Sequence, residues 1–467
     1  MKYNNKTIQI ITILALVFIS LGLLSSCEDS LKLGQLDESN FETPEQAIGY
    51  LMDGNGKNNM SLVEFRNEGE IDIYLALTNT ADQNATVAIK YDSKVFEDYN
   101  AEHNTNFELL PEGLVTFEGD LEIAKGSKKS EKILVKFITD EALDSDKTYV
   151  IPVSTELKSG NIKLAEKQSN FLILVKDFSE IPTADKSTGI KIISCMEVND
   201  TNPLNNLCFT LKSNNKPLID QVILFSSNIN YNNETGEVYV FHNPSVTHIL
   251  NNRDKYIKPL QDRGIKVILS ILGNHDRSGV GNLSDETAKV FAQELKAVCD
   301  AYKLDGVFFD DEYSSYQNPP PPGFVSPSND AASRLVYETK MAMPDKLVQV
   351  YVLSRTNSLV TIDGKQPGEY IDYGIHDYGR GTDMSSRYPG LSKDGMALYS
   401  QEFHNEYFTS RYNLRDLRNN GYGAHMIFAM DPLRSNYSRQ RTAMQMIAEE
   451  LFDDELVVDN NFYRKDW

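Results

Sequence analysis

The chain has 467 residues and a formal net charge of −21 at pH 7. A chain of this length can form two domains, each with its own hydrophobic core. The excess of acidic residues argues against a nucleic-acid-binding protein, because phosphate contacts require a basic surface, whereas a neutral substrate carries no such penalty.

The first 27 residues are typical of a targeting segment and are excluded from the folded domains. Lys2 and Lys6 form a basic start, residues 8–24 form an apolar core, and the segment ends in Leu24-Ser25-Ser26-Cys27. These last four residues resemble the lipobox of bacterial lipoproteins, in which cleavage leaves the cysteine as a lipid-modified N-terminus. We therefore expect residues 1–27 to be a lipoprotein signal peptide and Cys27 to carry the lipid chains of a durable anchor.

The residues after the signal bear on where the protein resides. Glu28 and Asp29 resemble the acidic tag that sends some Gram-negative lipoproteins to the outer face of the outer membrane. The expected location is therefore the cell outer membrane, lipid-anchored and surface-exposed. An uncleaved transmembrane anchor is the alternative, although its apolar run is near the short limit for a spanning helix.

Residues 28–180 are expected to form an all-β sandwich module, because short alternating runs are separated by charged or Gly/Asn/Asp-bearing breaks. The predicted strands are 71–77, 85–91, 113–117, 131–137, 148–154 and 170–175, and one helix is predicted at 93–103. The module contains no catalytic constellation. It can serve as a spacer, as a glycan-binding module, or as a docking site for surface glycan-binding partner proteins.

Residues 181–467 are expected to form a (β/α)8 TIM barrel. After a linker at 179–187, strand-like and helix-like segments alternate with longer spacing. The predicted strands are 190–196, 221–225, 266–271, 306–310, 347–353, 370–374, 395–399 and 424–429. The predicted helices are 245–263, 285–302, 330–343, 413–419 and 438–451. Eight strands within roughly 270 residues fit the usual size of such a barrel.

The run Leu304-Asp305-Gly306-Val307-Phe308-Phe309-Asp310-Asp311-Glu312-Tyr313 contains the strongest candidate site. Side chains two positions apart on a strand point the same way, so Phe308, Asp310 and Glu312 share one face and Asp311 lies on the other. In a parallel barrel the C-terminal strand ends carry the chemistry, and two carboxylates there can perform general acid/base catalysis. The alternative is a solvated turn or a helix cap, the commoner fate of an acidic cluster.

Polar side chains also follow the other predicted strands, and they would converge on the same rim. They are Glu197 and Asn199, Ser226 to Asn228, Gly273 to His275, His376 to Tyr378, Gln401 and Glu402, and Asp431. Most of them are expected to be ordinary loop residues. Cys195, Cys208 and Cys299 lack the spacing of a zinc site and are read as buried apolar side chains, with a Cys195–Cys208 disulfide as an open alternative.

The carboxylate run resembles the signature of the family 18 glycoside hydrolases, and of their endo-β-N-acetylglucosaminidases of the endoglycosidase H and F type. That signature has two aspartates and a glutamate at alternate positions after Asp-Gly, and Asp305 to Glu312 follow it with one change. Residues 266–275 resemble the family's third-strand motif, Glu197 to Asn199 the end of its first strand, and Ser226 to Tyr231 its second.

The resemblance implies a retaining reaction assisted by the substrate, an exception to the two-carboxylate scheme. Glu312 would be the general acid, Asp310 would orient the 2-acetamido group that attacks its own anomeric carbon, and Tyr378, with Asp377, would hydrogen-bond the acetamido oxygen. The residues expected to bind the sugars are Glu197, Asn199, Asn228, Gly273, Asn274, His275, Tyr313, Asp377 and Gln401. No cofactor and no metal are expected.

The sequence departs from the family pattern at Phe308, where the family usually has its first aspartate. Members that have become lectins typically lose the glutamate, whereas Glu312 is present. The only tryptophan is Trp467, so the flat platforms on which long chitin chains stack are missing.

The expected reaction is therefore hydrolysis of the β-1,4 bond in the chitobiose core of N-glycans or glycoproteins, with high-mannose chains first. The alternatives are a non-hydrolytic glycan-binding protein of the same fold, a chitinase-like or peptidoglycan-directed hydrolase, and a structural surface protein.

Overall fold

The computed structural model describes residues 46–103, 105–139 and 143–467. The expected signal peptide and Cys27 lie outside the described residues. Within the part of the chain that is described, no helix combines the length and the apolar character needed to cross a membrane.

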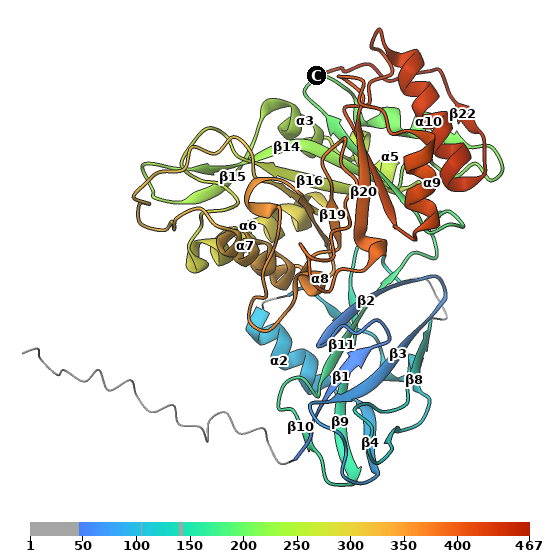
Figure 1. Cartoon of the computed structure of the whole chain (residues 1–467), viewed down its shortest axis with the longest axis vertical. Coiled ribbons are helices and arrows are strands. Elements are labelled where there is room, and N and C mark those ends of the chain that lie inside the picture. The colour runs from blue at the N-terminus through green and yellow to red at the C-terminus, as the bar shows by residue number, and fades with distance from the viewer. Residues whose placement is uncertain (1–45, 104, 140–142) are drawn as a thin grey trace, which may run out of the picture. The chain divides into compact units, whose positions relative to one another are not determined.

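The N-terminal module consists of two sheets (Figure 1). The first, in the order β10-β1-β3-β8-β6, contains β1 (Ile48–Asp53), β3 (Glu68–Leu77), β6 (Val115–Phe117), β8 (Ile133–Ile138) and β10 (Lys163–Leu164). The second, in the order β2-β11-β9-β4-β7, contains β2 (Met60–Phe65), β4 (Ala85–Tyr91), β7 (Leu121–Ile123), β9 (Tyr149–Ser159) and β11 (Phe171–Asp177), and β5 (Glu108–Leu109) pairs with β9.

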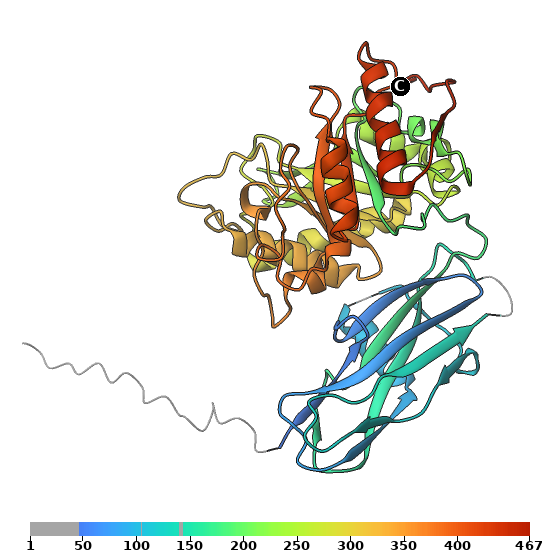
Figure 2. The same ribbon diagram turned by 45° about the vertical axis from the view of Figure 1, so that its right-hand side comes forward.

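The two sheets form a sandwich-like module (Figure 2). Buried side chains alternate with more exposed ones along strands such as β8, as expected for a sheet with one face in the core. Phe65 of the second sheet and Phe137 of the first pack edge to face, with ring centroids 5.1 Å apart. The prediction located β4 and the helix α2 (Ser93–His103) at their observed bounds but missed β1, β2, β5, β7 and β10. In β1, Gly49 interrupts the apolar alternation because it packs directly on Leu75, where a Cβ would come within 2.7 Å.

Eight parallel strands form a closed barrel in the second half of the chain. In chain order they are β12 (Lys191–Glu197), β14 (Gln221–Tyr231), β16 (Lys266–Leu272), β17 (Gly306–Asp310), β18 (Leu347–Tyr351), β19 (Tyr373–Ile375), β20 (Met396–Glu402) and β21 (Ala424–Phe428). The barrel closes because β12 pairs with both β14 and β21. β15 (Val238–His242) extends the sheet as an antiparallel partner of β14, and β13 (Phe209–Leu211) pairs with β22 (Leu456–Val458).

The helices agree with the sequence in part. α6 (Asp285–Tyr302), α7 (Asn329–Ala342), α9 (Arg411–Asn419) and α10 (Tyr437–Phe452) lie where helices were predicted, and Ser284, Ser328 and Ser410 cap the first three. The helix predicted at 245–263 is broken into α3 (Pro244–Asn251), α4 (Arg253–Tyr256) and α5 (Lys258–Gln261). The first break follows from Asn252, whose φ of −114° and ψ of 44° are not helical.

The strand predicted at 370–374 is wrong in its first half. Pro367 opens a short helix, α8 (Pro367–Tyr370), and Gln366 and Glu369 form a reciprocal capping box around its start. The strand β19 therefore begins at Tyr373.

The barrel has two separate apolar regions, one inside the sheet and one between the sheet and the helices. Phe308 belongs to the inner cluster with Cys195 and Tyr351, whereas Val307 and Phe309 belong to the outer one. This is the alternation expected for β17. Cys208 lies in the outer cluster and both cysteines are free, so the alternative of a Cys195–Cys208 disulfide is not realised.

Candidate active site

Asp310 is the last residue of β17. It lies at the C-terminal end of the barrel strands, two positions beyond Phe308 and on the same, inward-facing side of the strand. Its residue is only 3% exposed, and its Oδ1 atom has no hydrogen-bond partner among the described residues. Burial raises the pKa of Asp310 well above its ordinary value, and the charges of Glu312, Asp311 and Asp377 add to the rise. Asp310 is therefore a carboxyl group held close to other acids and away from water.

Glu312 lies two residues beyond the strand and is half-buried. Burial is again the largest cause that raises its pKa, followed by Asp377 and Asp311. The loop that carries it is tightly positioned: the amide of His275 donates to the carbonyl oxygen of Tyr313 at 2.6 Å. A Cβ at Gly273 would lie 2.2 Å from the carbonyl oxygen of Glu312, so only glycine permits this approach. A raised pKa favours the protonated form that a general acid needs.

Asp311 faces away from this pair, as the alternation predicts. Its Oδ1 accepts a hydrogen bond from the hydroxyl of Tyr316, and its Oδ2 accepts one from the amide of Arg355 at 2.9 Å. Asp311 therefore holds the neighbouring loops and has no free carboxylate oxygen for a substrate.

Tyr351, at the end of β18, is a site residue that the sequence reasoning missed. Its hydroxyl donates to Oδ1 of Asp377 at 2.6 Å, and its ring lies 6.2 Å from that of Phe308. Burial, this hydrogen bond and the charges of Asp377 and Asp310 raise the pKa of Tyr351. The signal that could have identified it is its position at the carboxyl end of a predicted barrel strand, two residues after the inward-facing Gln349.

Tyr378 follows β19 and lies beside the same acidic group. Burial raises its pKa, with contributions from Asp377, Glu402 and Glu312. Its ring stacks on that of Tyr407, with centroids 5.6 Å apart and an interplanar angle of 25°. Asp377 is near both Asp310 and Glu312, because its charge raises the pKa of each, and it links Tyr378, the next residue, to the hydroxyl of Tyr351.

Glu197 and Glu402 add two further carboxyl groups at the ends of β12 and β20. Burial, followed by Asp200 and Glu402, raises the pKa of Glu197 to about 7. Glu402 is buried and accepts hydrogen bonds from the amides of His404 and Asn405. Glu402 was not among the expected binding residues. Its burial depends on the loop that follows it, whose amides fold back onto its carboxylate, and the sequence does not reveal this.

The remaining predicted binding residues differ in their exposure. His275 and Tyr313 are exposed and their rings meet edge to face, with centroids 5.5 Å apart. Asn199 is exposed and Asn274 is half-buried. These four side chains are open to a ligand approaching the rim.

Asn228 and Gln401 have their amide groups bonded within the protein. Asn228 donates to the carbonyl oxygens of Leu272 and Gly273, which fixes β14 to the end of β16. Gln401 is bonded to Nε2 of His425 at 2.8 Å and to the amide of Thr409 at 3.1 Å. Both residues are buried, so the structure places them as supports of the strand ends and not as exposed sugar-binding groups.

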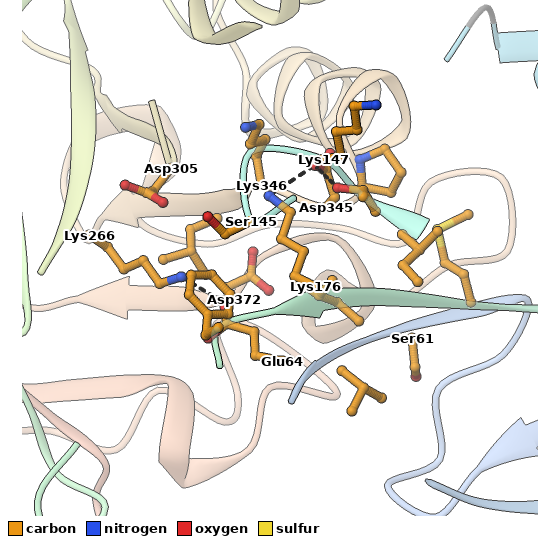
Figure 3. Close-up of a pocket in the computed structure, with 18 of the residues that line it drawn as sticks. Ser61, Glu64, Ser145, Lys147, Lys176, Lys266, Asp305, Asp345, Lys346 and Asp372 are labelled. Atoms are coloured by element: carbon orange, nitrogen blue, oxygen red, sulfur yellow. Dashed lines mark hydrogen bonds and ion pairs between the residues drawn. The ribbon is translucent and has the colours of Figure 1, made fainter. Parts of the chain in front are cut away.

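A hollow of about 1350 Å³ lies away from this site. Barrel residues that line it, such as Lys266, Asp305 and Asp372, stand at or before the starts of their strands, at the end of the barrel opposite Asp310. Residues of the N-terminal module line it as well, and Lys176 of β11 forms a buried ion pair with Asp345 at 3.2 Å (Figure 3). This charged hollow is therefore separate from the carboxyl group cluster.

The chemistry available at the rim is that of carboxyl and phenol groups. Among residues 46–103, 105–139 and 143–467, no group of three or more His, Cys, Asp or Glu side chains is arranged to hold a metal ion. An acid of raised pKa, a second carboxyl group beside it and a tyrosine hydroxyl can together protonate a leaving group and stabilise a positive charge.

Comparison with known proteins supplies a family for this arrangement. A family model described as a "-like, N-terminal domain" matches residues 42–162. The chain is 61% identical over 287 residues to "Endo-beta-N-acetylglucosaminidase F1" of Elizabethkingia meningoseptica, covering 61% of this chain and 85% of that protein. It is 31% identical over 243 residues to "Endo-beta-N-acetylglucosaminidase" of Flavobacterium sp. (strain SK1022), covering 52% and 75% of the two chains.

Two solved structures resemble the chain over almost its full length. EndoBT-3987 of Bacteroides thetaiotamicron with a Man5GlcNAc product is 36% identical, covers 89% of this chain and 97% of its own, and has a TM-score of 0.83. The same protein in complex with Man9GlcNAc2Asn is 35% identical, with the same coverage and a TM-score of 0.76.

Proposed function

Because this chain belongs to the endo-β-N-acetylglucosaminidase family, we propose that it hydrolyses the β-1,4 bond between the two core N-acetylglucosamines of N-glycans, leaving one sugar on asparagine. The observation that carries the proposal is the pair Asp310 and Glu312: Asp310 ends β17, Glu312 lies two residues beyond it, and both have raised pKa values, with the charge of Glu312 contributing to the rise at Asp310. High-mannose chains are the proposed substrates, and the glycans bound by the related EndoBT-3987 support this choice.

We propose a substrate-assisted mechanism of the family 18 type. Glu312, whose raised pKa favours the protonated form, gives its proton to the glycosidic oxygen as the bond from that oxygen to the anomeric carbon breaks. The acetamido oxygen of the same sugar forms a bond to the anomeric carbon and yields an oxazolinium ion. Asp310 accepts a hydrogen bond from the acetamido N–H and stabilises the positive charge of the oxazolinium ion. Glu312 then removes a proton from the water that opens the oxazolinium ring.

Two tyrosines are candidates for the hydrogen bond to the acetamido oxygen. Tyr378 is the residue that the sequence resemblance favours, and the contacts of Tyr351 with Asp377 and its nearness to Asp310 support a second candidate. Phenylalanine variants separate them: the tyrosine that acts on the acetamido group should lower kcat far more than KM when its hydroxyl is removed.

Substrate choice is also supported by where the only tryptophan lies. Trp467 stacks on His248 of α3, with ring centroids 5.6 Å apart, and Tyr256 of α4 meets it edge to face. It is therefore packed among helices and gives a linear chitin chain no platform. Chito-oligosaccharides should be poor substrates.

The decisive experiment is a digest of a glycoprotein that bears both high-mannose and complex chains, analysed by mass spectrometry. The expected products are glycans that end in one N-acetylglucosamine, with the other left on the protein. Glu312→Gln should abolish release while the glycan still binds. Failure of the unchanged protein to cut within chitobiose would contradict the proposal, and an active Glu312→Gln would contradict the role of Glu312.

We further propose that the chain is a lipoprotein held at the outer face of the outer membrane through Cys27. The lipobox-like residues 24–27 and the acidic pair after them support this. Labelling of cells with a radioactive fatty acid should mark the protein, and Cys27→Ser should abolish the label and release the protein from the membrane fraction. Equal labelling of both would contradict the anchor.

A further inference from the structure

A second hollow, of about 480 Å³, lies beside the proposed reaction site. It is formed by the loop after β19, by β20 with the loop that follows, and by the start of α9. The side chains that line it include Arg380, Tyr399, Glu406, Tyr407, Phe408 and Asn413. None of these residues has a role in the mechanism proposed above.

The hollow is continuous with the reaction site through two contacts. Tyr407, 57% exposed, stacks on Tyr378, whose pKa responds to the charge of Glu312. Arg380 forms an ion pair with Asp377, with Nε and Oδ2 3.5 Å apart. A ligand that reaches Glu312 can therefore extend over Tyr378 into this hollow without leaving the protein surface.

The walls are preorganised. Tyr407 and Glu402 exchange two backbone hydrogen bonds, of 2.8 and 3.0 Å, so the turn between them is closed. Glu406 within that turn is held by an ion pair with Arg439. On the facing wall, a Cβ at Gly381 would lie 2.0 Å from the ring of Tyr399, so this loop rests directly on β20. Ordered walls reduce the entropy that a bound ligand must lose.

The chemistry of the walls suits an uncharged sugar. Exposed aromatic faces pack against the C–H faces of a pyranose, and the guanidinium, carboxylate and amide groups of Arg380, Glu406 and Asn413 can bond its hydroxyls. One cation and one anion lie on these walls, so no charged ligand is favoured. The volume is within the range of small-molecule sites.

We propose that this hollow binds a mannose of the glycan's arms and that Tyr407 is a specificity-determining residue. The inference rests on the proposed function and deepens it. A branched high-mannose chain brings many hexoses to the walls of the cleft, whereas the protein side of the scissile bond contributes a single sugar. A mannose of one of the arms is therefore a better candidate for the sugar that contacts Tyr407 than the single N-acetylglucosamine on the protein side.

The test is the kcat/KM of Tyr407→Ala on substrates that differ only in their arms: Man9GlcNAc2-Asn, Man5GlcNAc2-Asn and GlcNAc2-Asn. Loss of one aromatic stacking face should lower the value for the mannosylated substrates about tenfold more than that for GlcNAc2-Asn, because any effect passed on through Tyr378 is common to all three substrates. Tyr407→Phe keeps the face and should stay near the unchanged protein. Asn413→Phe, which fills the hollow from the other wall, should reproduce the arm-dependent loss.

Tyr412→Ala is the matched control, because Tyr412 is 75% exposed on the same helix as Asn413 but does not line the hollow. It should change none of the three values. An equal loss for Tyr407→Ala on all three substrates, or no loss, would overturn the inference, with thermal midpoints confirming that the variants fold. Failure of the proposed function is distinguishable, because the unchanged protein would then cut none of the substrates.

Discussion

Phe308 is the one position of the signature that differs, and its replacement by alanine tests what the ring does. Phe308 is 2% exposed, and its ring packs near Tyr351 inside the barrel. Truncating a buried phenylalanine costs about 3–5 kcal/mol of unfolding free energy. For a barrel of roughly 280 residues we expect the thermal midpoint to fall by about 5–8 °C.

The cavity left by Phe308→Ala would not be purely apolar. In the strand register Phe308 is flanked on the same face by Ser270 and Gln349. Within the described part of the chain, their Oγ and Oε1 atoms are buried without a hydrogen-bond partner, as is Oδ1 of Asp310. A cavity with several polar partners can hold water. Water there would lower the cost of ionising Asp310, because burial is the largest cause of its raised pKa.

The assay is the pH dependence of kcat/KM together with thermal unfolding. If Asp310 acts as a carboxylate, the acid limb of the pH profile of kcat/KM should lie at lower pH in Phe308→Ala than in the unchanged protein. The destabilisation caused by Phe308→Ala should also become smaller as pH rises. With its raised pKa, Asp310 stabilises the unchanged protein below about pH 4, and this contribution disappears as pH rises through the folded-state pKa. The variant, in which the pKa of Asp310 is less raised, has less of this contribution to lose.

Phe309→Ala is the matched control. Phe309 is the adjacent residue on the same strand, fully buried, but it faces the helices. It should destabilise the barrel comparably without moving the acid limb. The reasoning is refuted if both variants move the limb, or if neither does.

Three further predictions concern other positions. Gly273→Ala should lower kcat about 100-fold and also lower the thermal midpoint, because its Cβ would displace the loop of the proposed acid, whereas Gly113→Ala, which has open space, should be neutral in both; equal activities would contradict this. Asp345→Ala should cost about 3–5 kcal/mol in a denaturant titration by leaving the buried Lys176 unpaired, and adding Lys176→Met should restore most of it. Burial raises the pKa of Glu197 from 4.5 to about 7, so its stabilising contribution is full below about pH 4.5 and is lost as pH rises through 7; Glu197→Gln should flatten the pH dependence of the thermal midpoint between about pH 4.5 and 7, and parallel curves would show that burial does not raise this pKa.

The local elements of the barrel could be read from the sequence because their signals are local. β17 and α6 have their predicted bounds, since an apolar run of strand length and a helix with a serine cap need no distant partner to be recognised. The same alternation correctly separates Phe308 from Phe309. At residues 370–374 the strand-like pattern was misleading in its first half. Pro367 and the capping residues Gln366 and Glu369 start the short helix α8 there instead.

What the sequence determined by itself was therefore the order and approximate position of the eight barrel strands and the carboxyl pair at the end of one of them, because side-chain direction along a strand follows from its period of two. What the tertiary structure decided was which groups from other strands meet that pair. Tyr351 and Asp377 come from β18 and from the loop after β19, and Gln401, which the sequence favoured as a sugar ligand, is turned inward to His425. Such choices depend on strand register and on loop closure, so they exist only once the barrel is closed.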